Sequence, residues 1–198
     1  MINYIISYNK PHRHFVDFHL STSVNGASKM LFQLPAWRPG RYELGNFSQN
    51  IQKWGAFNKH GKALPFRKQT KDLWEVDTKG EDKIQIIYNF YANQLDAGSC
   101  YLDENQLYLN PVHCIFYIVG RMDEEYSIDL DVPNNYQIAS SIRNQGNRLF
   151  VNSYDMLAES PIICSDTLQH DTYQVNDIKF YIWFQGECNP NWEKLKED

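Results

Sequence analysis

The sequence lacks the features of a membrane protein, a secreted precursor or a polyanion-binding protein. Its 198 residues contain no apolar run close to the roughly 18 residues of a membrane span. Residues 1–10 lack the basic head, apolar run and small-residue cleavage site of a signal peptide. Lys and Arg total 19 against 24 Asp and Glu, and they are scattered along the chain. We therefore expect no membrane or nucleic-acid partner, and a cytoplasmic or periplasmic location.

Motifs of catalysis are also missing. The chain contains no His-Glu-x-x-His zinc motif, no Gly-x-Ser-x-Gly elbow, no P-loop and no Gly-x-Gly-x-x-Gly. His12 and His14 would share one face of a strand, but His19 would lie on the other face, and no third ligand is implied nearby. The carboxylates favour solvated loop charge over a catalytic pair. We predict no catalytic residue, no metal site and no cofactor in this chain, which should be inactive alone.

Cysteine is scarce and carries no metal-binding spacing. The four cysteines contain no Cys-x-x-Cys pair, and they are Cys100, Cys114, Cys164 and Cys188. Reduced, partly buried thiols are the interpretation that this pattern favours. A Cys100–Cys114 bridge across a hairpin and a reactive or metal-binding thiol remain the alternatives. A chain of this length buries roughly 70% of its unfolded surface, so it needs no such staple to fold.

Aromatic residues are plentiful, and strand-like runs recur about every ten residues. The chain has 13 Tyr, 11 Phe and 5 Trp, residues that favour strands and binding surfaces. Apolar and polar residues alternate in several runs, with turn residues between them. We predict an all-β fold, an antiparallel two-sheet β-sandwich, with strands within residues 4–8, 14–20, 29–34, 73–78, 84–92, 106–109, 115–119, 128–132, 149–152 and 178–184. The predicted core contains Val16, Phe18, Ile86, Tyr88, Leu130, Phe180 and Ile182.

The composition changes only near the C-terminal end. We assign residues 1–187 to the sandwich and residues 188–198 to a linker and the start of a helix. Asn189 would cap this helix and Pro190 would be its first residue. A helix this short is marginal alone, so Trp192 should fray or dock onto the sandwich or a neighbouring molecule. We expect a further domain downstream.

The most distinctive stretch is Leu-Pro-Ala-Trp-Arg-Pro-Gly-Arg-Tyr at residues 34–42. Its two prolines and its glycine shape a rigid loop that contains large aromatic faces beside two arginines. One interpretation is a crossover between the sheets whose aromatic side chains plug the end of the sandwich. The other is a loop that presents these groups to a ligand or an adjoining domain. We expect Trp37 to be a packed anchor, and Arg38, Arg41 and Tyr42 to be exposed contacts.

This stretch resembles the Leu-Pro-x-Trp-x-Pro-Gly-x-Tyr signature of PDZ-containing glycyl aminopeptidases, zinc metallopeptidases of peptidase family M61. The resemblance continues in order through residues 46–51, 61–65, 71–76, 88–92 and 101–103 to Tyr-Asp-Met-Leu-Ala-Glu-Ser-Pro at 154–161. Glu159 stands where the family usually has Asp. The resemblance implies a β-sandwich followed by a thermolysin-like catalytic domain, which holds the zinc, and a PDZ domain.

The resemblance also implies a function. This chain would be the non-catalytic N-terminal domain of a zinc aminopeptidase, bracing the catalytic domain and walling the substrate cleft. Its partners would be its own downstream catalytic and PDZ domains and a peptide substrate. It also adds Tyr101 and Asp103, on a loop between strands, to the interface candidates Trp37, Arg38, Arg41 and Tyr42. The alternatives are a freestanding carbohydrate- or peptide-binding module and a purely structural or adhesive one.

Overall fold

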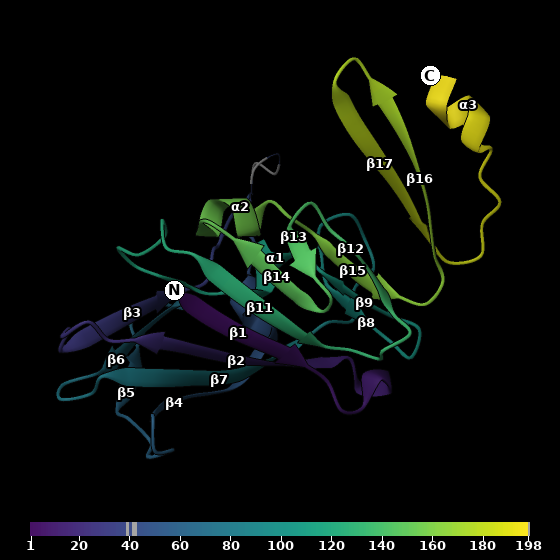
Figure 1. Ribbon diagram of the computed structural model, residues 1–198. Helices are drawn as coiled ribbons and strands as arrows, with labels where there is room; N and C mark the ends of the chain where they lie inside the picture. The colour runs from purple at the N-terminus through teal and green to yellow at the C-terminus, as the bar shows by residue number, and fades with distance from the viewer. Residues whose placement is uncertain (39, 41–42, 198) are drawn as a thin grey trace.

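The computed structural model of the protein describes residues 1–38, 40 and 43–197, and strands dominate it (Figure 1). The strands are β1 Ile2–Ser7, β2 Phe15–Ser23, β3 Lys29–Gln33, β4 Ile51–Asn58, β5 Phe66–Lys68, β6 Leu73–Asp77, β7 Lys83–Tyr91, β8 Tyr101–Leu102, β9 Gln106–Leu109, β10 Tyr117–Ile118, β11 Tyr126–Asp131, β12 Gln137–Ala139, β13 Arg143–Gln145, β14 Arg148–Val151, β15 Ile162–Ser165, β16 Leu168–Val175 and β17 Ile178–Gln185. The predicted all-β fold is confirmed.

Helices are short and lie between the strands. They are α1 Pro111–Cys114, α2 Tyr154–Ala158 and α3 Trp192–Glu197, with 3₁₀ turns at η1 Pro11–Arg13 and η2 Phe47–Asn50. None of the helices in the described part of the chain has the length and apolarity needed to cross a bilayer.

The strands form one large sheet, two smaller ones and a separate hairpin. The large sheet has the order β13-β14-β11-β1-β2-β7-β4, and the smaller ones have the orders β10-β3-β6-β5 and β12-β15-β9-β8. β16 and β17 pair only with each other among the described strands. One pair departs from the predicted antiparallel pattern, because β1 runs parallel to β11 from Ile2↔Tyr126 to Ser7↔Asp131. The long connection between these strands permits a parallel pairing, which a tight turn does not.

The core lies between the large sheet and the two smaller ones. Val16 and Phe18 of β2 are 0% and 1% exposed, and the Phe18 ring stacks on Tyr88 of β7 with centroids 4.9 Å apart. Ile86 and Leu130 are buried as well. The period-2 alternation therefore identifies the inward face of these strands correctly.

Three buried tyrosines fix the segment 114–116 against the large sheet. The Tyr4 hydroxyl donates to the carbonyl of Phe116 at 3.0 Å and accepts from the Phe116 N–H at 3.1 Å. Tyr88 and Tyr154 donate to carbonyls of the same segment at 2.7 and 2.8 Å. Burial raises the pKa of all three hydroxyls well above the ordinary value, so they stay protonated donors.

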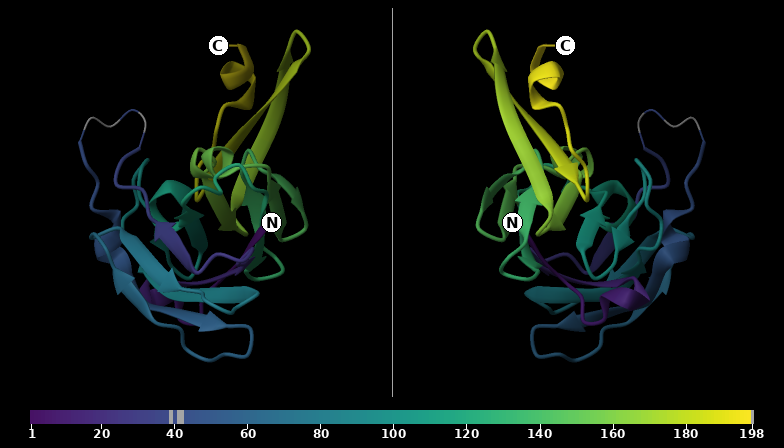
Figure 2. Two further views of the ribbon diagram at one scale, coloured as in Figure 1. Left: turned by 90° about the vertical axis from the view of Figure 1, so that its left-hand side faces the viewer. Right: turned by 90° about the vertical axis from the view of Figure 1, so that its right-hand side faces the viewer.

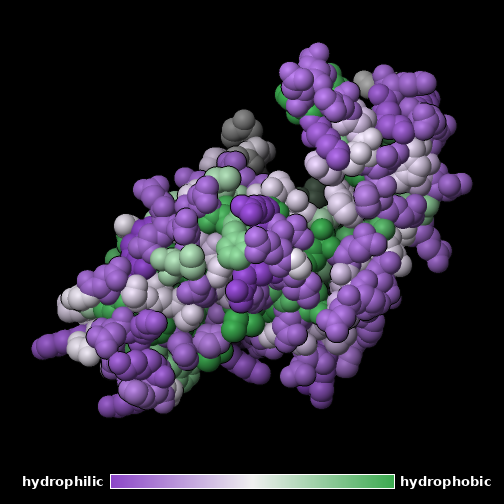
Figure 3. Space-filling model, viewed as in Figure 1, coloured by the Kyte–Doolittle hydropathy of each residue, from purple (hydrophilic) through white to green (hydrophobic). Residues whose placement is uncertain are grey.

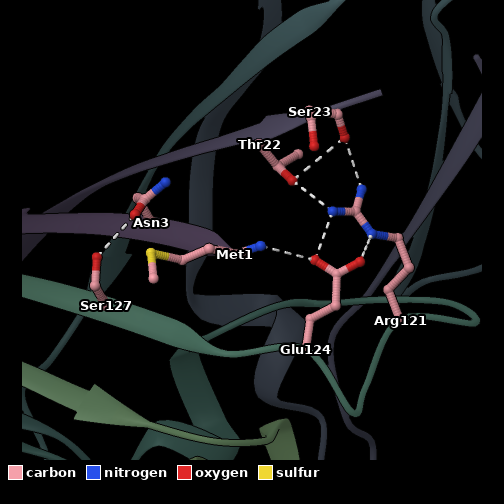
Figure 4. Close-up of polar contacts among 7 residues, drawn as sticks. All are labelled: Met1, Asn3, Thr22, Ser23, Arg121, Glu124 and Ser127. Atoms are coloured by element: carbon pink, nitrogen blue, oxygen red, sulfur yellow. Dashed lines mark hydrogen bonds and ion pairs between the residues drawn. The ribbon is translucent and has the colours of Figure 1, made fainter. Parts of the chain in front are cut away.

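A polar cluster ties the turn before β11 to the start of β1 and the end of β2 (Figure 4). Arg121 donates to both carboxylate oxygens of Glu124 at 2.6 and 2.8 Å. The same guanidinium donates to the Thr22 hydroxyl and to the Ser23 carbonyl. The amine of Met1 lies 3.2 Å from Glu124. Arg121 first and this amine second lower the pKa of Glu124 to about 2.

The hairpin β16–β17 overturns part of the predicted core. It projects from the sandwich in Figure 1, with α3 beside it. Phe180 is 39% exposed and Ile182 is only half-buried, so neither lies between the sheets. The prediction for these two residues is wrong, because alternation shows which face of a strand is apolar but not what covers it. The surface in Figure 3 is mostly hydrophilic, with apolar residues in small groups.

The C-terminal helix also begins later than expected. Asn191 caps α3, since its Oδ1 accepts from the Lys194 N–H at 3.1 Å; the predicted cap at Asn189 is wrong. Trp192 docks on the hairpin rather than on the sandwich, with its ring 5.4 Å from that of Phe184. Each Asn precedes a residue that can open a helix, so the local sequence alone does not decide between the two caps.

Candidate functional site

The two longest motifs of the sequence meet at one groove. This groove has a volume of about 600 Å³ and receives side chains from the loop after β3, the loop before β8, α1, β10 and α2. Its lining residues are Pro35, Trp37, Arg38, Ala97, Asn110, Val112, Tyr117, Met122, Tyr154, Asp155, Ala158, Glu159 and Pro161. Residues 35–38 and 154–161 are more than a hundred positions apart in the sequence, and the fold makes them neighbours.

The loop after β3 leaves the sandwich from a fixed base. Leu34 is fully buried, and its N–H donates to the carbonyl of Asp72 at 2.9 Å. Gly45 returns the chain to this base, because its N–H donates to the carbonyl of Ala36 at 2.7 Å. Trp37, beyond the base, is 47% exposed. The prediction that Trp37 anchors the loop inside the sandwich is wrong: Leu34 supplies the anchor and leaves the indole free to line the groove.

Arg38 lies across the loop before β8, is half-buried and lines the groove; its role as a contact stays a prediction. A Cβ added at Gly98 would stand 2.2 Å from the Arg38 Nη2, so the guanidinium lies directly against this glycine and would have to shift for a larger residue. Asp96 shapes this turn by accepting from the Gly98 N–H at 2.8 Å, which lowers the pKa of its carboxyl. The Arg38 Nε is buried and has no hydrogen-bond partner among the described residues. An acceptor supplied from outside the chain would satisfy it.

Helix α2 supplies the opposite wall. Ser153 caps it by accepting from the Met156 N–H at 3.4 Å, and buried Tyr154 and Leu157 hold it on the core. Asp155 and Glu159 remain exposed and line the groove. The groove therefore combines an apolar floor, one guanidinium with an unused donor and two carboxylates. Glu159 stands where the family motif usually has Asp, so the negative charge is kept on a side chain that is one methylene longer.

Tyr101 and Asp103 lie elsewhere. The Tyr101 ring packs 6.0 Å from His14, whose Nδ1 is 2.6 Å from the carbonyl of Leu102. Asp103 accepts from the backbone N–H groups of Asn105 and of the residue after it, which shapes the β8–β9 turn. Desolvation and the neighbouring Asp103 raise the pKa of Tyr101. Tyr101 and Asp103 contact each other, but neither lines the groove. The described site candidates therefore lie in two separate places: Trp37 and Arg38 at the groove, and Tyr101 and Asp103 at the β8–β9 turn.

The remaining candidates, Arg41 and Tyr42, lie outside the described residues. Within residues 1–38, 40 and 43–197, no three His, Cys, Asp or Glu side chains are grouped to hold a metal ion. His12 instead lies 4.0 Å from Glu104, and His14 packs between Leu102 and Tyr101. The side chains described do not fit a zinc site, so we derive no zinc chemistry for this chain.

Sequence comparison identifies the family. The family described as "Peptidase M61 N-terminal domain" matches residues 3–166 of this chain. The chain belongs to this family. The resemblance that began with residues 34–42 is therefore confirmed, and both motifs that line the groove lie inside the matched range. No curated protein matches the chain.

One solved structure shows the same fold in a longer polypeptide. The chain superposes on an aminopeptidase N family protein from Idiomarina loihiensis with a TM-score of 0.90 and 23% identity, over 100% of this chain and 34% of that one. This chain thus spans about a third of the length of that protein. Yeast LTA4 hydrolase is far more distant, with a TM-score of 0.39 and 9% identity over 91% of this chain and 30% of its own length.

Proposed function

We propose that this M61 N-terminal domain is the non-catalytic domain of a zinc aminopeptidase, and that its grooved face braces the catalytic domain and walls the substrate cleft. The observation that carries the proposal is the convergence of the family motifs at 34–42 and 154–161 on one groove. These motifs are separated in the sequence but adjacent in space. A shared functional surface accounts for that adjacency better than two unrelated structural roles do.

The chemistry of the groove suits a protein or peptide surface. Trp37 is 47% exposed, and a partner that covers this large apolar side chain would gain binding free energy from its burial. Arg38 holds a buried Nε donor that pairs with no described residue, and a backbone carbonyl or carboxylate of the partner would accept from it. Asp155 and Glu159 on the facing wall attract an amine or a guanidinium. A polypeptide carries all of these complementary groups.

The hairpin offers a second contact for the same partner. β16–β17 lies after the family match to 3–166 and exposes Val175 at 50% and Ile178 at 63%. A lone two-stranded hairpin is marginally stable in water, so a covering surface would stabilise it. Figure 2 shows the hairpin rising from the same end of the sandwich as the described residues 34–38 that follow β3. One domain seated at that end would contact both.

Two experiments test this function. The purified chain should not hydrolyse aminoacyl p-nitroanilides even with added zinc, because no nucleophile, base or zinc motif is present in its sequence. Turnover that is abolished by chelator and that copurifies with the chain would overturn the proposal.

The reading frame downstream of Asp198 is the second test. A His-Glu-x-x-His motif within about a hundred residues would support the aminopeptidase assignment. A stop codon directly after Asp198 would contradict it and would favour a freestanding carbohydrate- or peptide-binding module. In that case the groove would be titrated directly with oligosaccharides and short peptides.

A further inference from the structure

Two of the four cysteines pack together beside the groove. Cys100 directly precedes β8, and Cys114 is the last residue of α1. The carbonyl of Asn110 receives both thiols, with Sγ–O distances of 3.7 Å for Cys100 and 3.6 Å for Cys114. The Asn110 N–H also donates to the Cys100 Sγ at 3.3 Å. Burial first, and the neighbouring Cys100 thiol second, raise the pKa of the Cys114 thiol.

This pair is sealed from solvent, unlike the exposed Cys188. Cys100 is 2% and Cys114 is 0% exposed, and burial raises the pKa of the Cys114 thiol well above its ordinary value. Cys164 is also buried, on β15, but its pKa is raised to about 12 by burial alone, with no thiol contributing. The chain therefore has one adjacent thiol pair, one isolated buried thiol and one exposed thiol.

We propose that Cys100 and Cys114 form a disulfide when the protein folds under oxidising conditions, and that they remain a buried dithiol in a reducing compartment. Only these two cysteines converge on a single backbone acceptor in the structure. Both sulfurs lie within 3.7 Å of the same carbonyl oxygen, so the fold brings the two thiols to one place. Thiol hydrogen bonds to a carbonyl are weak, and little is lost when both S–H donors are removed.

The oxidant we assign is a low-molecular-weight disulfide such as oxidised glutathione. One cysteine thiolate attacks it, forming a mixed disulfide and releasing the first glutathione thiol. The second cysteine thiolate attacks the protein sulfur of the mixed disulfide and releases the second glutathione. The protein loses two electrons and two protons, and the reagent gains both. Burial seals both thiols in the folded protein and raises the pKa of Cys114, so the reaction precedes their burial during folding.

The bridge would tie together two walls of the groove. Groove-lining Ala97 and Gly98, which lies against Arg38, come just before Cys100, while groove-lining Asn110 and Val112 come just before Cys114. Residues 100 through 114 make a closed loop of 15 residues. A disulfide that closes a loop of this size is expected to raise the melting temperature of a protein of this length by about 6–12 °C.

The test is refolding in a buffer of reduced and oxidised glutathione. Free thiols are then blocked with N-ethylmaleimide, and a peptide map is run without reduction. We expect one linked peptide pair, Cys100 with Cys114, and a protein mass about 2 Da below that of the reduced protein, because two hydrogens leave. The melting temperature should rise by the amount given above, and dithiothreitol should reverse this rise. The variant Cys114→Ala should lose this rise, whereas the matched control Cys164→Ala should keep it.

The peptide map decides the matter even where Cys114→Ala fails to fold. Alkylation of both Cys100 and Cys114 after refolding in the oxidising buffer would overturn the proposal. Linkage of either residue to Cys164 or Cys188 would overturn it as well. The activity of the longer protein plays no part in these measurements, so the outcome is independent of the proposed peptidase function.

Discussion

Neutralising Glu124 should weaken the fold near neutral pH and leave it almost unchanged in acid. The carboxylate accepts two hydrogen bonds from Arg121 and lies 3.2 Å from the Met1 amine. These cations lower the pKa of Glu124 from 4.5 to about 2. Because the folded pKa is depressed, the stabilisation is complete above the unfolded pKa and disappears as pH falls from about 4.5 to about 2.

The expected loss is modest. A pKa depression of this size corresponds to about 3 kcal/mol for a fully shielded group. The Glu124 side chain is 30% exposed, and solvent screening reduces the effect to about 1–2 kcal/mol. Glu124→Gln keeps the shape of the side chain but removes its charge, and it leaves the Arg121 guanidinium without a carboxylate. The matched control is Glu125→Gln, an exposed neighbour in the same turn.

Urea unfolding measured from pH 7 to pH 3 tests this. The free energy of unfolding of Glu124→Gln should lie about 1–2 kcal/mol below the wild type at pH 7. The gap should narrow steadily as pH falls below about 4.5 towards 3, while Glu125→Gln should follow the wild type throughout. A gap that stays constant with pH would refute the electrostatic reasoning and point to altered packing. Equal stability at pH 7 would show that the ion pair contributes nothing.

Two further outcomes are expected, the first from the structure and the second from the family resemblance. Tyr4→Phe leaves the Phe116 N–H and carbonyl without their buried partner, so the melting temperature should fall by roughly 4–8 °C. The control Tyr181→Phe, at an exposed position, should change the melting temperature very little. Equal shifts of the two variants in differential scanning calorimetry would contradict this reasoning. In the full-length aminopeptidase that we propose, Arg41→Ala and Tyr101→Ala should change kcat/KM for peptides more than the melting temperature, and unchanged kinetics with a large loss of stability would return both residues to a structural role.

Local patterns determined the strands and their inward faces. Val16, Phe18 and Tyr88 were placed correctly because the two-residue period of a strand is a property of the backbone itself. The same rule failed for Phe180 and Ile182, which form an equally apolar face on a hairpin that leaves the sandwich. Alternation marks a face that needs covering, and only the path of the chain decides whether the sandwich covers it.

The site followed the same division. The sequence alone pointed to residues 34–42, because their unusual spacing of proline, glycine and aromatic residues can be recognised without a structure. The family resemblance added residues 154–161. It did not show that these stretches share a groove, that Leu34 rather than Trp37 anchors the loop, or that Asn110 receives both Cys100 and Cys114. Each of these facts depends on contacts between segments distant in the sequence, which the closure of the sandwich brings together and which no local propensity encodes.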